Sequence, residues 1–193
     1  MQVMTTEAAR SWCTQEALGL RVRRYDRLTY GQSRPHRFFV AAPELHREIV
    51  VLAREMTHGE NQVAGGLLWL QRWDIGSPEL VRTGWRILED IRRANGQPAP
   101  LEIAPAVLFR DDEAVEQHVF LIQTIAYGWV ADFVPRGGGF FLHFKDNRQI
   151  CFASRSLQIH RELMLAFQRW NPSAEDPMTM KIRSIREARS KRL

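Results

Sequence analysis

The segment 140–153 has the sequence FFLHFKDNRQICFA, in which two apolar runs flank a polar stretch around Asp146-Asn147. Aromatic and β-branched residues favour strands, and a short polar pair between two such runs favours a tight turn. The segment therefore predicts a β-hairpin, with Phe140 to Phe144 as its first strand and Gln149 to Ala153 as its second.

The two faces of this hairpin follow from the length of its turn. If Asp146-Asn147 forms a two-residue turn, Lys145 lies opposite Arg148 and His143 lies opposite Ile150. One face then carries the residues expected in the core, which are Phe140, Leu142, Phe144, Cys151 and Ala153. The other face becomes polar toward the turn, where His143 and Lys145 point to the same side.

Outward from the hairpin, the sequence predicts further strands and several helices. Strand patterns extend over 36–41, 101–103, 106–110 and 119–134, and a mixed, irregular segment covers 21–30. Helical patterns extend over 6–17, 43–58, 61–73, 78–94 and 156–170. The pattern is strongest at 78–94, because Ser77 and Pro78 favour a helix start and Asn95-Gly96 favours its end.

The order of these elements indicates the fold class. Most helices precede residue 97, most strands follow residue 100, and one helix comes late. Such segregation predicts an α+β fold in which N-terminal helices pack on one face of a C-terminal antiparallel sheet. A chain of 193 residues suits a single domain. We place that domain at residues 1–171, followed by a basic tail at 172–193 that is either flexible or an appended helix.

The net charge of +5 is concentrated near the end of the chain. Residues 181–193 contain Glu187 as their only carboxylate, and the charges of all other residues sum to zero. The cations of this stretch are Lys181, Arg183, Arg186, Arg189, Lys191 and Arg192. The high isoelectric point is therefore a property of the tail and gives no evidence for a basic face on the body.

The tail carries the first functional hypothesis, a non-enzymatic binding or accessory protein. Clustered cations bind the phosphates of nucleic acid or an acidic protein surface, while a solvated terminus without a partner stays open as the alternative. A membrane partner is not expected, because no stretch approaches the roughly 18 uninterrupted apolar residues of a bilayer-spanning helix. Assembly into a homo-oligomer stays open.

The cysteines and the missing motifs limit the chemistry. Cys13 and Cys151 are far apart, form no CxxC pair, and are accompanied by no secretory leader. They are expected to be reduced thiols in a cytoplasmic protein, with a disulfide as the less favoured alternative. The acidic cluster Asp111 to Glu113 is expected to be a solvated turn, and no motif indicates a metal or a cofactor.

The second functional hypothesis is a small metal-independent enzyme that acts on a phosphate-bearing substrate, as a nuclease does. His143 and Lys145 would supply acid–base chemistry and positive charge, and Arg136, which opens a glycine-rich loop, would bind the anion. A second histidine, His118 or His160, would complete the site. The alternative is ordinary polarity on a half-exposed sheet, and the enzyme hypothesis needs a titratable partner within reach of His143.

Overall fold

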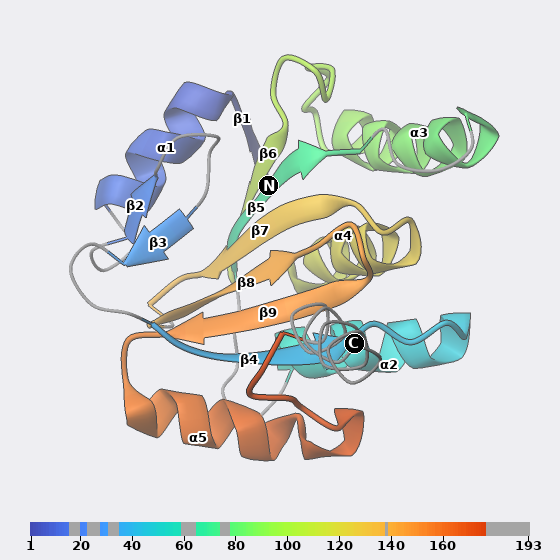
Figure 1. Cartoon of the computed structure of the whole chain (residues 1–193). Coiled ribbons are helices and arrows are strands. Elements are labelled where there is room, and N and C mark those ends of the chain that lie inside the picture. The colour runs from blue at the N-terminus through green and yellow to red at the C-terminus, as the bar shows by residue number, and fades with distance from the viewer. Residues whose placement is uncertain are drawn as a thin grey trace, which may run out of the picture.

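An antiparallel sheet of seven strands forms the centre of the molecule in the computed structural model, which describes residues 1–15, 20–22, 28–30, 35–58, 65–73, 78–137 and 139–176. The strand order is β1–β6–β5–β7–β8–β9–β4 (Figure 1). The bounds of the strands are β1 Gln2–Met4, β4 His36–Ala41, β5 Gly66–Arg72, β6 Ala106–Phe109, β7 Val130–Pro135, β8 Phe140–Phe144 and β9 Gln149–Ser154.

Helices and a small hairpin surround this sheet. The helices are α1 Thr6–Gln15, α2 His46–His58, α3 Pro78–Ala94, α4 Ala114–Ala126 and α5 Leu157–Ala166, followed by the 3-10 turn η2 Gln168–Trp170. Strands β2 Leu20–Val22 and β3 Leu28–Tyr30 form a separate two-stranded sheet. No helix among the described residues is long and apolar enough to span a membrane.

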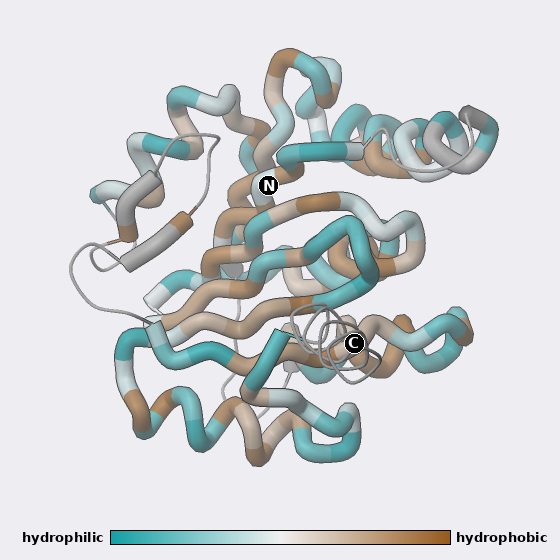
Figure 2. Tube along the Cα trace, in the orientation of Figure 1, coloured by the Kyte–Doolittle hydropathy of each residue, from teal (hydrophilic) through white to brown (hydrophobic). Residues whose placement is uncertain are grey.

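The sheet has two unequal faces. Helices α2, α3, α4 and α5 contribute to the larger hydrophobic core, which includes Phe38 of β4 and Phe152 of β9. On the second face, α1 and the β2–β3 hairpin pack against a smaller cluster that includes Trp69 and Phe141. The strands between these layers are mostly hydrophobic (Figure 2), as expected for strands that are covered on both sides.

The predicted α+β class and antiparallel sheet are confirmed, and the helix over 78–94 is confirmed as α3. The expectation that the sheet begins after residue 100 is wrong, because β1, β4 and β5 come from the first half of the chain. The late helix is also present. Ser156 caps α5 by accepting hydrogen bonds from the backbone N–H groups of Gln158 and Ile159.

Two predicted elements have the opposite structure. Residues 61–73 were expected to be helical, but β5 occupies their described part, because a run that is apolar all round suits a buried central strand as well as a helix. Residues 119–134 were expected to be one strand, but α4 extends to Ala126 and only 130–134 lie in a strand, β7. Its buried residues Gln117, Phe120, Leu121, Thr124 and Ile125 recur at helical spacing. The predicted strand at 101–103 is a turn.

The β8–β9 hairpin forms, but with a register that differs by one residue from the predicted one. His143 lies opposite Cys151 instead of Ile150, and the Lys145 N–H donates to the Gln149 carbonyl at 2.8 Å. The cause is Arg148, whose φ of +57° extends the turn into a three-residue loop. Because side chains alternate along a strand, this shift exchanges the two faces of β9. Ile150 and Phe152 enter the larger core, and Cys151 joins His143 on the second face.

Candidate functional site

A row of polar residues crosses the second face of the sheet along one line of cross-strand partners. Asp132 of β7 lies opposite His143 of β8, which in turn lies opposite Cys151 of β9. The row ends at Trp69 of β5 on one side and at Phe39 of β4 on the other. Directly opposite residues have Cβ atoms about 4.5–5.5 Å apart, so the register brings a carboxylate, an imidazole and a thiol together.

Asp132 and His143 form a hydrogen-bonded pair. The Asp132 side chain is only 2% exposed, and its Oδ1 lies 2.8 Å from Nδ1 of His143. Its second oxygen, Oδ2, accepts a hydrogen bond from Nε2 of Gln71. Because a carboxylate only accepts, Nδ1 carries the proton, and Nε2 of a neutral His143 bears the lone pair. The pair thus fixes both the orientation and the tautomer of the imidazole.

His143 opens onto a pocket of about 270 Å³ on this face. Its side chain is 25% exposed, and its hydrogen bond to Asp132 is made through Nδ1, not Nε2. The pocket is lined by Leu28, Arg37, Phe39, Phe141, His143, Lys145, Cys151, Ala153 and Asp176. The cavity therefore offers a ligand an apolar wall, one histidine, two cations and one carboxylate.

The two cations of the pocket are held differently. Nζ of Lys145 lies 2.5 Å from Oδ2 of Asp176 and 4.8 Å from the centre of the Phe39 ring. Arg37 extends from the neighbouring strand β4 and is exposed. Lys145, which is 23% exposed and lies against Phe39, attracts an anion more strongly than a cation in open solvent does, because the local dielectric constant is lower. The pocket is therefore suited to an anionic group.

Cys151 lies in the pocket, but its thiol is not activated. Burial raises the pKa of Cys151 to about 11, although Arg37 and Lys145 act in the opposite direction. Burial and the nearby Asp132 raise the pKa of Cys13 to about 12. Both thiols are therefore protonated near neutral pH and are weak nucleophiles. Within the row, His143 is the residue that both lines the pocket and is oriented by a hydrogen bond to Asp132.

The other predicted site residues lie elsewhere. Arg136 is exposed in the turn between β7 and β8, at the far end of these strands from Lys145, and does not line the pocket. Nε2 of His118 lies 3.1 Å from the Val50 carbonyl, within the helical layer. The six cations of the tail lie outside the described residues. Of the predicted residues, His143 and Lys145 line the same pocket.

His160 also lies on the opposite face from His143. Its ring centre is 5.7 Å from that of His36 and 5.6 Å from that of Phe38, a residue of the larger core. Burial, His36 and Arg161 lower the pKa of His160. Neither His118 nor His160 therefore serves as the expected second histidine, because the sheet separates both from the pocket.

The acidic cluster Asp111 to Glu113 is only partly the solvated turn that was expected. Glu113 is buried, and its Oε1 pairs with Nη2 of Arg110 at 2.8 Å. Asp111 and Asp112 are exposed. Within the described part of the chain, no three His, Cys, Asp or Glu side chains are grouped closely enough to hold a metal ion.

Asp132 is a candidate site residue that the sequence did not predict. It is the one carboxylate in the otherwise apolar strand Val130–Pro135. A charged residue inside such a run is rarely buried without a partner. Asp132 was therefore recognisable as a candidate for a buried charged pair. The predicted hairpin over 140–153 did not include its strand, so nothing placed Asp132 beside His143.

No family model matches the chain, no curated protein matches it, and no solved structure matches it.

Proposed function

We propose that the protein is an acid–base enzyme for a small phosphate-bearing substrate, with His143 as its general base. The observation that carries the proposal is the 2.8 Å contact between Nδ1 of His143 and the buried Asp132. A partly exposed histidine oriented by a buried carboxylate is an arrangement by which enzymes set up proton transfer. This is the second of the two functions that the sequence left open.

The pocket supports the choice of a phosphate-bearing substrate. Lys145 and Arg37 line the same cavity as His143 and would bind phosphate oxygens by charge-assisted hydrogen bonds. The apolar wall formed by Phe39 and Phe141 would accommodate an organic portion of the ligand. A volume of about 270 Å³ is near the lower end of the range for ligand pockets, which suits a small molecule.

The chemistry assigned to His143 is removal of a proton from water. Nε2 would take the proton while the water oxygen forms a bond to phosphorus, and the ester P–O bond would break. The departing alkoxide would take a proton from solvent and the imidazolium would release its proton to solvent, because the leaving oxygen lies opposite the attacking water and out of reach of Nε2. Lys145 and Arg37 would stabilise the charge that accumulates on the phosphate oxygens.

The test uses p-nitrophenyl phosphate and bis(p-nitrophenyl) phosphate, whose hydrolysis is followed by absorbance. Wild type is compared with His143→Gln and with His160→Gln, a matched control on the opposite face of the sheet. We expect His143→Gln to lower turnover by about 10²- to 10⁴-fold, the usual contribution of a general base, and His160→Gln to leave it unchanged.

Binding is measured separately from turnover. Calorimetric titration with inorganic phosphate should show binding to wild type and binding at least about tenfold weaker to Lys145→Gln, because the ionic contact is lost. Equal turnover by wild type and His143→Gln would exclude the assigned base. Absence of phosphate binding to the folded wild-type protein would exclude the substrate class.

The charge of the tail favours a second function, binding of nucleic acid or an acidic protein partner through residues 181–193. Six cations on duplex DNA would give a log–log salt slope of roughly −5. A gel-shift titration at two salt concentrations should show that the full chain binds more tightly than a chain without residues 178–193. Equal binding by the two chains would exclude this role for the tail.

A further inference from the structure

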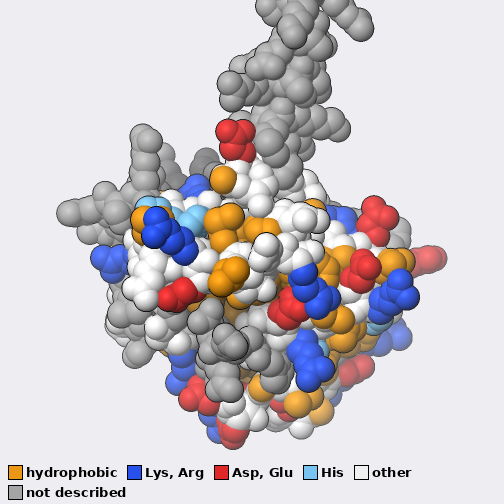
Figure 3. All heavy atoms as spheres, turned by 90° about the horizontal axis from the view of Figure 1, so that it is seen from below, with side chains coloured by type: hydrophobic (Ala, Val, Ile, Leu, Met, Phe, Trp, Pro, Cys, Tyr) orange, Lys and Arg blue, Asp and Glu red, His pale blue; other side chains and the backbone are white. Residues whose placement is uncertain are grey.

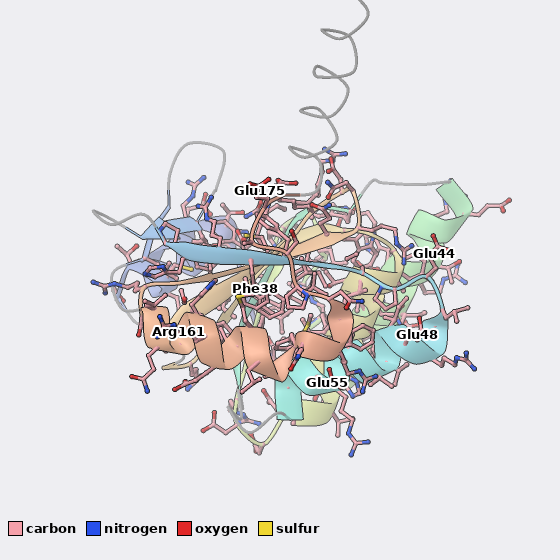
Figure 4. The ribbon with its side chains drawn as sticks, turned by 60° about the horizontal axis from the view of Figure 1, so that its bottom comes forward. Phe38, Glu44, Glu48, Glu55, Arg161 and Glu175 are labelled. Atoms are coloured by element: carbon pink, nitrogen blue, oxygen red, sulfur yellow. The ribbon has the colours of Figure 1, made fainter. Side chains whose placement is uncertain are left out.

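The chain that follows α5 crosses the edge of the sheet before it reaches the pocket. The backbone reverses at Asn171, whose φ is +50°. Ser173 then pairs with Phe39 of the edge strand β4, each N–H donating to the other residue's carbonyl at 2.8 Å. We call residues 171–176 the strap. In Figure 4, Glu175 of the strap lies on the other side of β4 from α5.

A local turn then directs the strap to the pocket. The Ser173 hydroxyl donates to the Glu175 carbonyl at 2.8 Å and accepts from the Glu175 N–H at 3.3 Å. Asp176 therefore comes to line the pocket, and its Oδ2 contacts Nζ of Lys145. Both side chains of this ion pair are about a quarter exposed, 25% for Asp176 and 23% for Lys145.

Asp176 has the chemistry of a ligand for this pocket. Its carboxylate is an anion that contacts the cation assigned above to substrate phosphate, in the cavity that His143 lines. Lys145 has three N–H donors on one compact charge, so the carboxylate and an incoming phosphate compete for the same group. When the site is already filled in some of the molecules, the apparent affinity for a ligand falls in proportion to the fraction of molecules in which the site is free.

We propose that Asp176 is an internal stand-in for the phosphate of the substrate, and that the substrate displaces it from Lys145 and loosens the strap. This inference rests on the proposed function. The strap acts as a competitive gate, because closure by Asp176 and binding of phosphate exclude each other at Lys145. The pairing of Ser173 with Phe39 is the backbone contact that opens when Asp176 leaves.

The expected effect on affinity follows from the exposure of the ion pair. Removing one partner of an exposed pair costs little and removing one partner of a buried pair costs much more, so a pair with both side chains a quarter exposed is intermediate. We expect Asp176→Asn, which removes the charge and keeps the shape, to bind inorganic phosphate about tenfold more tightly than wild type. Glu175→Gln is the matched control, because Glu175 has the same charge on the same strap and does not line the pocket.

A second readout needs no ligand. The Phe39 amide donates to Ser173, so its hydrogen exchange reports opening of the strap. Asp176→Asn should speed this exchange several-fold without phosphate, Glu175→Gln should not, and saturating phosphate should speed it in wild type.

The outcomes separate the two proposals. If phosphate binds wild type and Asp176→Asn equally and Phe39 exchanges at the same rate in both, the gate is wrong and the proposed function stands. If phosphate binds neither protein, the proposed function and the stand-in role of Asp176 are both wrong, whatever the exchange rate. The gate is supported if Asp176→Asn binds phosphate more tightly and exchanges the Phe39 amide faster than wild type, while Glu175→Gln does neither.

Discussion

Removal of the His143 side chain should destabilise the protein through the carboxylate that it leaves behind. In His143→Ala, Asp132 keeps the hydrogen bond from Gln71, but it loses the donor at 2.8 Å. Hydrogen bonds to charged groups contribute about 1.5–3 kcal/mol, and breaking a fully buried pair costs about 3–5 kcal/mol. Because His143 is a quarter exposed and Gln71 still donates, we expect a loss of about 2–3 kcal/mol of unfolding free energy.

A double-mutant cycle isolates the pair from the two individual side chains. Asp132→Ala removes the buried charge, so a subsequent His143→Ala no longer leaves a carboxylate without its donor. We therefore expect the double variant to be more stable than the sum of the single losses predicts, by about 1.5–3 kcal/mol. Urea denaturation followed by tryptophan fluorescence gives the four free energies.

The control cycle pairs Asp132→Ala with His160→Ala, whose histidine lies on the opposite face of the sheet. Those two changes share no contact and should add to within about 0.5 kcal/mol. A coupling below about 0.5 kcal/mol between Asp132 and His143 would refute the buried pair. The candidate base would then have no carboxylate to orient it.

Three further predictions concern packing and pH. Gly84→Ala should lower the unfolding free energy by about 1–2 kcal/mol, although alanine favours helices more than glycine does, because the added Cβ would lie 2.6 Å from a Tyr127 ring carbon. Urea denaturation measures this change, and a gain in stability would contradict the packing of α3 on Tyr127. Stability should fall as pH rises above about 9, where the unfolded thiols lose protons and folded Cys151 and Cys13 still hold theirs, with pKa values of about 11 and about 12. Replacing both cysteines by alanine should reduce this loss in denaturation curves at pH 8 and 10.5, and an unchanged loss would contradict their burial. Stability should also fall as pH falls below about 6.5, because burial lowers the pKa of His160 and the unfolded chain binds the proton first; His160→Gln should flatten melting temperatures between pH 7 and 5, and an equal slope would contradict that assignment.

Elements with local start and stop signals were predictable from the sequence. Helix α3 begins at Pro78 and ends at Ala94, as the proline at its start and Asn95-Gly96 at its end predict. Strands β8 and β9 were also found, because alternation and turn residues are local properties. These segments carry their own structural information, independently of what packs on them.

Elements whose burial is set by neighbours were not predictable. Leu67, Leu68 and Trp69 of β5 are apolar on both faces, so their pattern does not distinguish a strand from a buried helix. Helix α4 contains β-branched and aromatic residues that favour strands, and packing against the sheet outweighs that preference. Both errors arise where tertiary burial decides the local structure.

The candidate site was predictable only in part. His143 and Lys145 share a strand and a side, which alternation alone establishes. Their partners come from other strands, and the one-residue difference at Arg148 decided that Cys151, rather than Ile150, lies beside His143. In Figure 3, acidic and basic side chains are interspersed on the side that α5 and α2 form, as expected for a body whose charges sum to zero.

The strand order has a consequence for synthesis of the protein. Each edge of the sheet joins parts of the chain that are made far apart in time: β1 pairs with β6 through Met4 and Ala106, and β4 pairs with β9 through Phe39 and Cys151. Such long-range pairings slow folding, because a large loop must close before any contact compensates for the lost entropy. The pocket is completed late, since its Asp176 leaves the ribosome after all the strands that the structure describes. A nascent chain therefore exposes β4 as an unpaired edge from the synthesis of β4 until that of β9, and an unpaired edge of this kind is prone to aggregation.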